Sequence, residues 1–348
     1  MFFRQRSKRG KISLVENNIT IRYLSGPDIA ALEMTPAEIL AAQEGCLKAQ
    51  GTNDAVIEPR MHLIPDPAFR GHFNVLRGYI ASLGVAGVKI VGDFIDNYQK
   101  GLPSEFATLN LMDARTGTPK AVIDATAITD MRTGAMTAVG AKHLGPSKPK
   151  VLGHIGARGS AYWNVRLLDH LFDFEEIRVH SRRPQSRNAF GARLESDLGK
   201  AITVTDNWRD CLEGADILVE ASRLDSPQPL FKTCWIKPGA LVIPYGTNST
   251  VEDDFTDIFD KVVVDHWEQC LIGPFGCLRR HVDSGRVTRD NIHSELGHIC
   301  AGLAPGRESD QETILFWHRG LSISDIALGY AMLEKANRLG IGLTLPYS

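Results

Sequence analysis

The stretch Lys150-Val-Leu-Gly-His-Ile-Gly-Ala-Arg-Gly-Ser-Ala161 decides the fold of this chain. A short apolar run enters a glycine-rich turn, and a helical pattern follows the turn. A second β-type run, Glu176 to His180, comes about twenty residues further on. This order predicts the first βαβ unit of a dinucleotide-binding fold. The glycines permit a tight turn, and the free N–H groups at the start of the helix suit a pyrophosphate.

The turn departs from the usual G-x-G-x-x-G/A spacing at its middle position. The best register places Arg158 where the backbone should approach the pyrophosphate, and Gly159 comes after it. Arg158 then either reaches the phosphates itself or is a solvated turn residue, and the sequence leaves both alternatives open. The cofactor contacts predicted in this turn are Gly156, Ala157, Arg158, Gly159, Ser160 and Ala161.

The residues after the second β-type run indicate which dinucleotide binds. An acidic residue at this strand end normally hydrogen-bonds the ribose 2′-hydroxyl of NAD. The chain has Ser181, Arg182 and Arg183 there, and a hydroxyl with two guanidiniums suits a 2′-phosphate. We therefore predict NADP(H) as the preferred cofactor, with NAD(H) as the second choice.

Composition is typical of a soluble globular protein. The 348 residues are enough for two domains, with 43% hydrophobic and 23% charged residues. The formal net charge of −2 gives no reason to expect a nucleic-acid or membrane partner. The cysteines form no CxxC pair and the histidines no HExxH pair, which predicts free thiols in a reducing cytoplasm and no metal site. The basic start, Met1 to Lys11, is expected to be an arm, with a transit peptide as the alternative.

The chain changes pattern at the linker 145–149. Before the linker, Thr35-Pro-Ala-Glu38 resembles a capping box that opens a helix. Strands of a mostly antiparallel sheet are expected at 72–80, 85–91, 107–113 and 121–123, followed by a helix over 128–144. After the linker, strands and helices alternate to about His266, as in a parallel, doubly wound sheet. A last amphipathic helix, Ser322 to Leu339, should return to the first part.

Three cations in the first part are candidate site residues. Lys89 lies inside an apolar β run, and a buried lysine costs several kcal/mol unless it is paired, so an inward Lys89 would imply an anionic ligand. Arg132 stands at the expected start of a helix, where it opposes the dipole and suggests a carboxylate or phosphate partner. With Arg60, these residues predict a pocket for a small carboxylate beside the nicotinamide. The alternative is that Lys89 is exposed on one face of its strand.

From about Leu24 onward, the chain resembles the ornithine cyclodeaminase/μ-crystallin family of NAD(P)-dependent enzymes. The motifs that carry the resemblance are Pro59-Arg60, Gly87-Val-Lys89, Gly101-Leu-Pro-Ser104, Asp113-Ala-Arg-Thr-Gly-Thr-Pro119, Thr129-Asp-Met-Arg-Thr-Gly-Ala135, Glu295-Leu-Gly297, Gly302-Leu-Ala-Pro-Gly-Arg307, and Thr313 to Phe316 with Gly320 and Asp325.

The resemblance implies a fold and a division of labour. A Rossmann domain, 133–317, would be inserted into an α+β substrate and dimerisation domain made from 1–132 and 318–348. A homodimer would bury the first-domain sheet against its twin. Arg60, Lys89 and Arg132 would handle the substrate carboxylate and imine, with Lys89 as the proton donor or as a hydrogen-bond partner of the substrate. Thr133 and Gly134 would lie at a helix start close to the cofactor pyrophosphate.

Two departures from the family pattern bear on the reaction. Cyclodeaminases of the family have an aspartate where this chain has Asn248, and an amide cannot ionise. The basic residues after the second strand also replace the acidic residue of enzymes that recycle NAD. Both departures favour net reduction.

The sequence therefore carries several hypotheses about function. The first is an NADPH-dependent reductase of a small imine or keto acid that produces an amino acid. The second is an ammonia-releasing cyclodeaminase with recycled NAD. The third is a μ-crystallin-like NADPH-dependent ligand-binding protein without turnover, and an opine-type condensing dehydrogenase is the remaining alternative.

Overall fold

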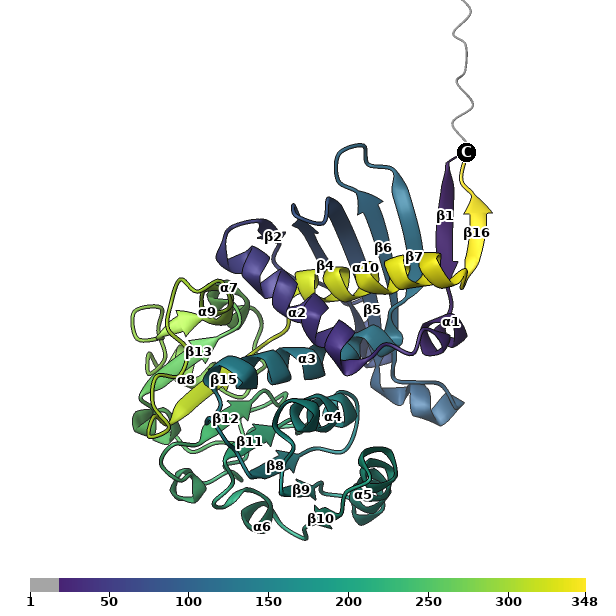
Figure 1. Ribbon diagram of the computed structural model, residues 1–348. Helices are drawn as coiled ribbons and strands as arrows, with labels where there is room; N and C mark the ends of the chain where they lie inside the picture. The colour runs from purple at the N-terminus through teal and green to yellow at the C-terminus, as the bar shows by residue number, and fades with distance from the viewer. Residues whose placement is uncertain (1–18) are drawn as a thin grey trace, which may run out of the picture.

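The computed structural model describes residues 19–348, which form two lobes, each built on its own sheet (Figure 1). The basic start, Met1 to Lys11, lies outside the described residues. No helix within 19–348 is long and apolar enough to cross a membrane.

The first lobe contains an eight-stranded sheet in the order β16-β1-β7-β6-β5-β4-β2, with β3 paired to β4. Only the pair of β1 and β7 is parallel, so the expectation of a mostly antiparallel sheet is confirmed. The two ends of the described chain lie side by side at one edge, because β1 pairs with β16. The strands are β1 (Thr20–Leu24), β2 (Ala55–Ile57), β3 (Met61–Leu63), β4 (Gly71–Ile80), β5 (Val85–Phe94), β6 (Glu105–Asp113), β7 (Pro119–Asp124) and β16 (Leu343–Pro346).

Helices α2 (Pro36–Gly51) and α10 (Ser322–Leu339) cover one face of this sheet, and the short α1 (Gly26–Ala31) lies near its edge (Figure 1). The capping box of α2 is confirmed, since Thr35 Oγ1 accepts from Glu38 N–H at 3.2 Å and the Glu38 carboxylate accepts from Thr35 N–H at 2.8 Å. Glycines bring α10 close to the strands: a Cβ on Gly87 would lie 2.7 Å from Ile326. This close approach sets the buried face of α10 directly over β5.

The second lobe contains a parallel sheet in the order β10-β9-β8-β11-β12-β15-β13-β14. Its first five positions have the order 3-2-1-4-5 of a Rossmann-type fold, so the predicted doubly wound sheet is confirmed. The strands are β8 (Val151–Ile155), β9 (Glu176–His180), β10 (Ile202–Val204), β11 (Ile217–Glu220), β12 (Leu241–Pro244), β13 (Lys261–Val264), β14 (Ser294–Glu295) and β15 (Ile314–Trp317). The helices are α4 (Ala161–Phe172), α5 (Pro184–Leu198), α6 (Trp208–Leu212), α7 (Trp267–Cys270), α8 (Arg279–Asp283) and α9 (Leu296–Cys300). Four 3-10 turns, at Pro67–Phe69, Ile95–Lys100, Thr233–Trp235 and Phe255–Ile258, complete the described elements.

Helix α3 (Thr126–Leu144) joins the two lobes and packs against α2, α4 and α10. One continuous apolar core runs from sheet strands of the first lobe through α3 into the second, for example from Leu109 through Met136 to Val219. The chain crosses between the lobes after α3 and again after β15. The proposed domain boundaries stay a prediction: 132/133 falls inside α3, and 317/318 falls at the end of β15.

Candidate active site

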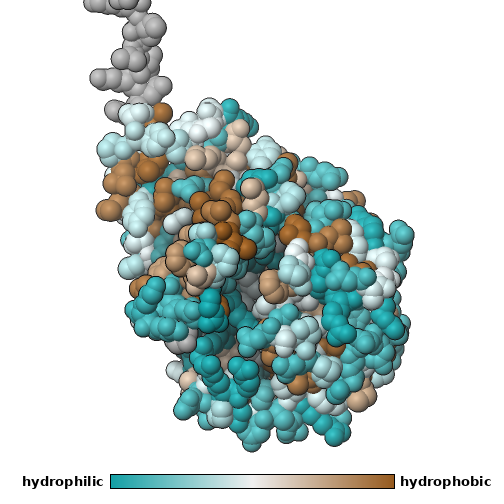
Figure 2. All heavy atoms as spheres, turned by 180° about the vertical axis from the view of Figure 1, so that it is seen from behind, coloured by the Kyte–Doolittle hydropathy of each residue, from teal (hydrophilic) through white to brown (hydrophobic). Residues whose placement is uncertain are grey.

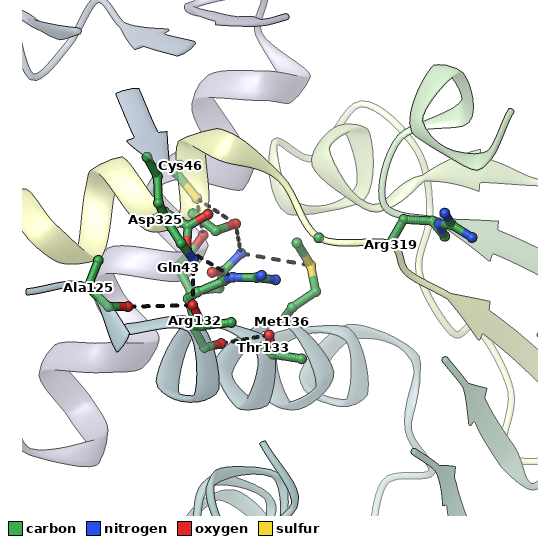
Figure 3. A network of polar contacts seen from close by, with 12 residues as sticks. Gln43, Cys46, Ala125, Arg132, Thr133, Met136, Arg319 and Asp325 are labelled. Atoms are coloured by element: carbon green, nitrogen blue, oxygen red, sulfur yellow. Dashed lines mark hydrogen bonds and ion pairs between the residues drawn. The ribbon is translucent and has the colours of Figure 1, made fainter. Parts of the chain in front are cut away.

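A buried ionic cluster lies between β5, α3 and α10. Lys89 Nζ donates to Asp325 Oδ1 at 2.8 Å and to Thr129 Oγ1 at 2.5 Å. Arg132 Nε donates to the same Asp325 oxygen at 3.1 Å. Lys89 is 1% exposed and Asp325 is fully buried, so the cluster is closed to bulk water. Figure 3 shows Arg132 and Asp325 turned toward one another from α3 and α10.

The electrostatics of this cluster follow from burial and from the shared carboxylate. Burial lowers the pKa of Lys89 and outweighs the raising effect of Asp325. Burial alone would raise the pKa of Asp325, but the charges of Lys89 and Arg132 hold it below its usual value. An ammonium with a lowered pKa can give up a proton more readily near neutrality, which suits acid–base work.

Two expectations about these cations were wrong. Lys89 points inward, but its anionic partner is Asp325 of the protein itself, so its burial does not by itself imply an anionic ligand. Arg132 lies in the second turn of α3, not at the helix N-terminus, because the helix begins at Thr126. Gly320 has φ +84°, which favours glycine, and a Cβ there would lie 2.3 Å from Arg132 Nη1, so the loop after β15 passes close to this guanidinium.

Arg60 completes the group of predicted substrate-side cations. Its Nη2 donates to the carbonyl of Arg319 at 3.2 Å, and its Nε has no partner among the described residues. Burial, followed by the positive charges of Arg132 and Arg319, lowers the pKa of Arg60 to about 10. The structure therefore brings Arg60, Lys89 and Arg132 into one charged region.

Two glycines of the glycine-rich turn have positive φ. Gly156 has φ +114°, and a Cβ there would lie 2.9 Å from the carbonyl oxygen of Ala221. Gly159 has φ +57°, so it supplies the second positive-φ position, one residue later than the usual spacing. Arg158 is exposed, and Ala161 begins α4 as a fully buried residue. The turn and the start of α4 fit a pyrophosphate.

The end of β9, where a Rossmann-type fold places the adenosine ribose, is basic. Arg182 and Arg183 are exposed directly after β9, and Ser181 is partly buried beside them. Neither arginine forms an ion pair with a carboxylate of the described chain. Pro184 begins α5 here, so the helix start adds its positive dipole end to this group. The residues present fit a phosphate on the ribose.

Helix α3 links the charged cluster to the glycine-rich turn. A Cβ on Gly159 would lie 3.3 Å from Asp130 Oδ1. Burial, followed by the charge of Glu105, raises the pKa of Asp130 to about 6, while Arg132, Arg223 and Lys89 oppose the shift. Asp130 was not foreseen as a site residue, and it directly follows Thr129, which accepts a hydrogen bond from Lys89.

Thr133 and Gly134 make contacts within α3 and between α3 and α4, which the sequence did not predict. Thr133 Oγ1 donates to the Thr129 carbonyl at 2.7 Å within α3. A Cβ on Gly134 would lie 2.6 Å from the backbone of Trp163, so this glycine lets α3 touch α4. Both residues lie in the interior of α3, so the expectation that they start a helix was wrong. Their contact with a pyrophosphate stays a prediction.

Aromatic residues connect the loop after β15 to the glycine-rich turn. The His318 ring lies 4.4 Å from that of Tyr245, whose hydroxyl lies 2.8 Å from Ser160 Oγ. Burial, and then Arg132, lowers the pKa of His318 to about 3, so this imidazole is neutral at physiological pH. The stack fixes the loop after β15 against the start of α4.

Asn248 is hydrogen-bonded to the backbone of a neighbouring loop. Its Nδ2 donates to the carbonyl of Leu224 at 2.7 Å and so holds the loop after β11 to the loop after β12. None of its described hydrogen bonds reaches Lys89, Arg132 or Asp325. Its predicted catalytic role therefore stays a prediction. The described residues also contain no group of three or more His, Cys, Asp or Glu side chains that could hold a metal ion.

The fold and these residues define a Rossmann-type protein with an α+β accessory lobe. The model of the ornithine cyclodeaminase/mu-crystallin family matches residues 30–339. The chain belongs to this family, so the resemblance seen in the motifs is confirmed.

Characterised relatives cover nearly the whole chain. An alanine dehydrogenase of Archaeoglobus fulgidus is 28% identical over 313 residues, which is 89% of this chain and 94% of the relative. The solved Δ(1)-pyrroline-2-carboxylate reductase of Thermococcus litoralis, in complex with NADH and L-proline, is 27% identical, with a TM-score of 0.86 over 93% of this chain and 100% of the other. A solved archaeal alanine dehydrogenase dimer with bound NAD is 27% identical, with a TM-score of 0.86 over 95% of this chain and 100% of the other. These relatives are oxidoreductases, and the two solved ones hold NAD or NADH.

Proposed function

We propose that this protein is an NADP(H)-dependent reductase that converts a small imino or keto acid into an amino acid. The observation that carries the proposal is the placement of α3. Within two turns, this helix supplies Thr129 and Arg132 to the Lys89 cluster and Asp130 to the glycine-rich turn. A substrate beside Lys89 would therefore lie next to a cofactor bound at that turn.

The chain's own residues divide the work of binding and proton transfer. Arg60 and Arg132 bind the substrate carboxylate, because guanidiniums pair with carboxylates through two parallel hydrogen bonds. A keto acid first condenses with ammonia and loses water to give the imine. When bound, a reduced nicotinamide supplies the hydride to the carbon of the C=N bond. Lys89 Nζ holds the proton that goes to the substrate nitrogen, and Asp325 orients the ammonium. The hydride and the proton together convert the imine to an amine.

Discrimination between the cofactors is assigned to the residues after β9. Ser181, Arg182 and Arg183 offer a hydroxyl and two unpaired guanidiniums to a 2′-phosphate. The relatives' bound NAD and NADH do not carry this phosphate. The preference for NADP(H) therefore rests on these three residues of this chain.

A direct assay tests the proposal. The oxidation of NADPH and of NADH is followed with a panel of small 2-keto acids, each with ammonium or methylamine so that imines form in solution. We expect turnover with an imino or keto acid and a higher kcat/KM with NADPH. Absence of turnover with both nicotinamides across the panel would overturn the proposed reaction, and a preference for NADH would overturn the cofactor assignment.

We further propose that the protein is a homodimer that buries the outer face of the first sheet. No described helix covers this face, because α2 and α10 lie on the other (Figure 1). Figure 2 shows hydrophobic residues gathered on it, and the related archaeal alanine dehydrogenase is a dimer. Such a broad exposed apolar face is typical of an interface. Its exposed apolar residues include Val56, Met61, Leu63, Ile90, Phe106, Met112 and Leu343.

The mass in solution tests this interface. Ile90 follows Lys89 in β5, so its side chain points to the opposite, outer face of the sheet. Ile90→Lys therefore places a charge at the centre of the outer face. We expect a dimer for the parent and a monomer for this variant by light scattering, with Leu303→Lys, an exposed residue of the second lobe, as the dimeric control. A monomeric parent would contradict the proposal.

A further inference from the structure

A second cationic group lies beside the Lys89 cluster, and the reaction proposed above does not use all of it. A small cavity is lined by Arg60, His62, Gln269, Ile272 and Arg319. Arg60 lines this cavity and donates to the carbonyl of Arg319, and the charge of Arg132 also acts on it. Figure 3 shows Arg319 well apart from the Lys89 network.

The two groups differ in how their charges are balanced. Lys89 and Arg132 share the carboxylate of Asp325. Arg60 and Arg319 form no ion pair with any carboxylate of the described residues. Within residues 19–348, the Arg319 guanidinium donates only to backbone carbonyls, at 3.1 Å to Ile272 and more closely to Phe275, and Arg60 Nε has no hydrogen-bond partner. A buried donor without an acceptor is costly, so an anion that accepts from Arg60 would be stabilised here.

Asp265 attracts both arginines electrostatically but forms no ion pair with either. Asp265 is fully buried and accepts backbone N–H bonds from His266, Arg319 and Gly320. Burial raises its pKa, which opposes a negative charge there. Its contacts instead fix the backbone that carries Arg319, so the guanidinium is positioned before any ligand arrives.

We propose that Arg319, with His62 and Arg60, binds a second carboxylate of the substrate, so that the preferred substrate is a dicarboxylic imino or keto acid. This inference rests on the proposed reductase function. In this arrangement the carboxylate beside the reacting carbon lies at Arg132 and Arg60, and the distal one lies at Arg319. A charge-assisted pair at the distal end contributes about 10- to 100-fold to kcat/KM for the diacid.

Matched keto acids measure this contribution. Reduction of 2-oxoglutarate is compared with that of 2-oxopentanoate, and oxaloacetate with 2-oxobutanoate, each with ammonium and the preferred nicotinamide. The two acids of each pair have the same number of carbon atoms and differ in the distal carboxylate. We expect the parent to favour the diacid at least tenfold in kcat/KM in one pair, mainly through KM.

Arg319 and Arg279 both donate to backbone carbonyls of the loop at 271–275. Variants of the two therefore separate recognition of the distal carboxylate from support of this loop. Arg319→Gln should lower the diacid-to-monoacid ratio of kcat/KM by about 10- to 100-fold, and Arg319→Lys should restore part of it. Arg279→Gln is the matched control: Arg279 donates to the carbonyl of Leu271 in the same loop but does not line the cavity. This control should keep the parent ratio.

The outcomes distinguish the inference from the function on which it rests. Equal loss for diacid and monoacid in Arg319→Gln, or a parent that reduces monoacids as well as diacids, would overturn the distal carboxylate site and leave the reductase function standing. No reduction of any acid would overturn the function itself. If Arg319→Gln does not fold, the parent ratio and Arg319→Lys still decide.

Discussion

The Lys89 cluster between β5, α3 and α10 and the arginines after β9 differ in what balances their charge. Lys89 and Arg132 are buried and share Asp325, whereas Arg182 and Arg183 are exposed and form no ion pair with the described chain. A buried, balanced cation is part of the folded structure, so its loss affects stability and chemistry together. An exposed, unbalanced cation costs the fold little, so its loss affects mainly the ligand. The comparison predicts different kinds of damage in the two regions.

The largest effect on stability is expected for Asp325→Asn. This change leaves Lys89 and Arg132 buried without a counter-charge, and breaking such a pair costs about 3–5 kcal/mol in free energy of unfolding. Asp257→Asn removes an exposed partner of Arg286 and should cost less than about 1 kcal/mol. Denaturant titration of both variants measures the change in free energy of unfolding. Similar small losses would show that the buried cluster is not balanced as described.

The next effect is on turnover, in Lys89→Met. The methionine fills a similar volume but carries no proton, so kcat should fall by at least about 100-fold. Lys120→Met, which removes an exposed lysine paired with Asp113, is the control. Rates are measured on samples with the parent's circular dichroism. A fall confined to the yield of folded protein would make Lys89 structural only.

At the nucleotide end, Arg182→Ala combined with Arg183→Ala should lower affinity and leave the fold intact. Loss of the charged contacts to the 2′-phosphate should reduce the ratio of NADPH to NADH affinity by about 10- to 100-fold. Titration calorimetry with both nucleotides gives the ratio. Arg193→Ala, on the same helix but far from the strand end, should keep the parent ratio. An unchanged ratio in the double variant would mean that these arginines do not contact the phosphate.

The smallest effect depends on pH and concerns Asp130. Its pKa is raised to about 6, so the folded protein disfavours the ionised carboxyl. This destabilisation develops as pH rises from the usual value of 3.8 toward 6 and is complete above it. Asp130→Asn should therefore gain Tm over the parent above pH 6 and lose that advantage near pH 4. A difference in Tm that does not vary with pH would contradict the assignment.

Local sequence signals predicted the elements well. Helix α10 begins and ends where its apolar stripe does, at Ser322 and Leu339, and β9 occupies the predicted five residues. The capping box at Thr35 also formed as expected. In each case the deciding interactions lie within one element, so their spacing in the sequence carries the information.

Long-range partners could not be predicted in the same way. The acceptor for Lys89 lies 236 residues away, and no spacing rule connects the two. The pairing of β1 with β16 and the insertion of β15 between β12 and β13 depend likewise on the assembled sheets. One signal was present for Asp325, because a carboxylate on the apolar stripe of a helix requires a buried partner.

The most direct test of the central claim is the stoichiometry of a single turnover. Protein with bound NADPH is mixed with a limiting imino acid that supports turnover, and the oxidised nicotinamide, the amine and the ammonia are quantified. The account predicts one NADPH oxidised for each amine formed and no ammonia released from the amino-acid product. Ammonia release without net oxidation, or binding without any product, would contradict it.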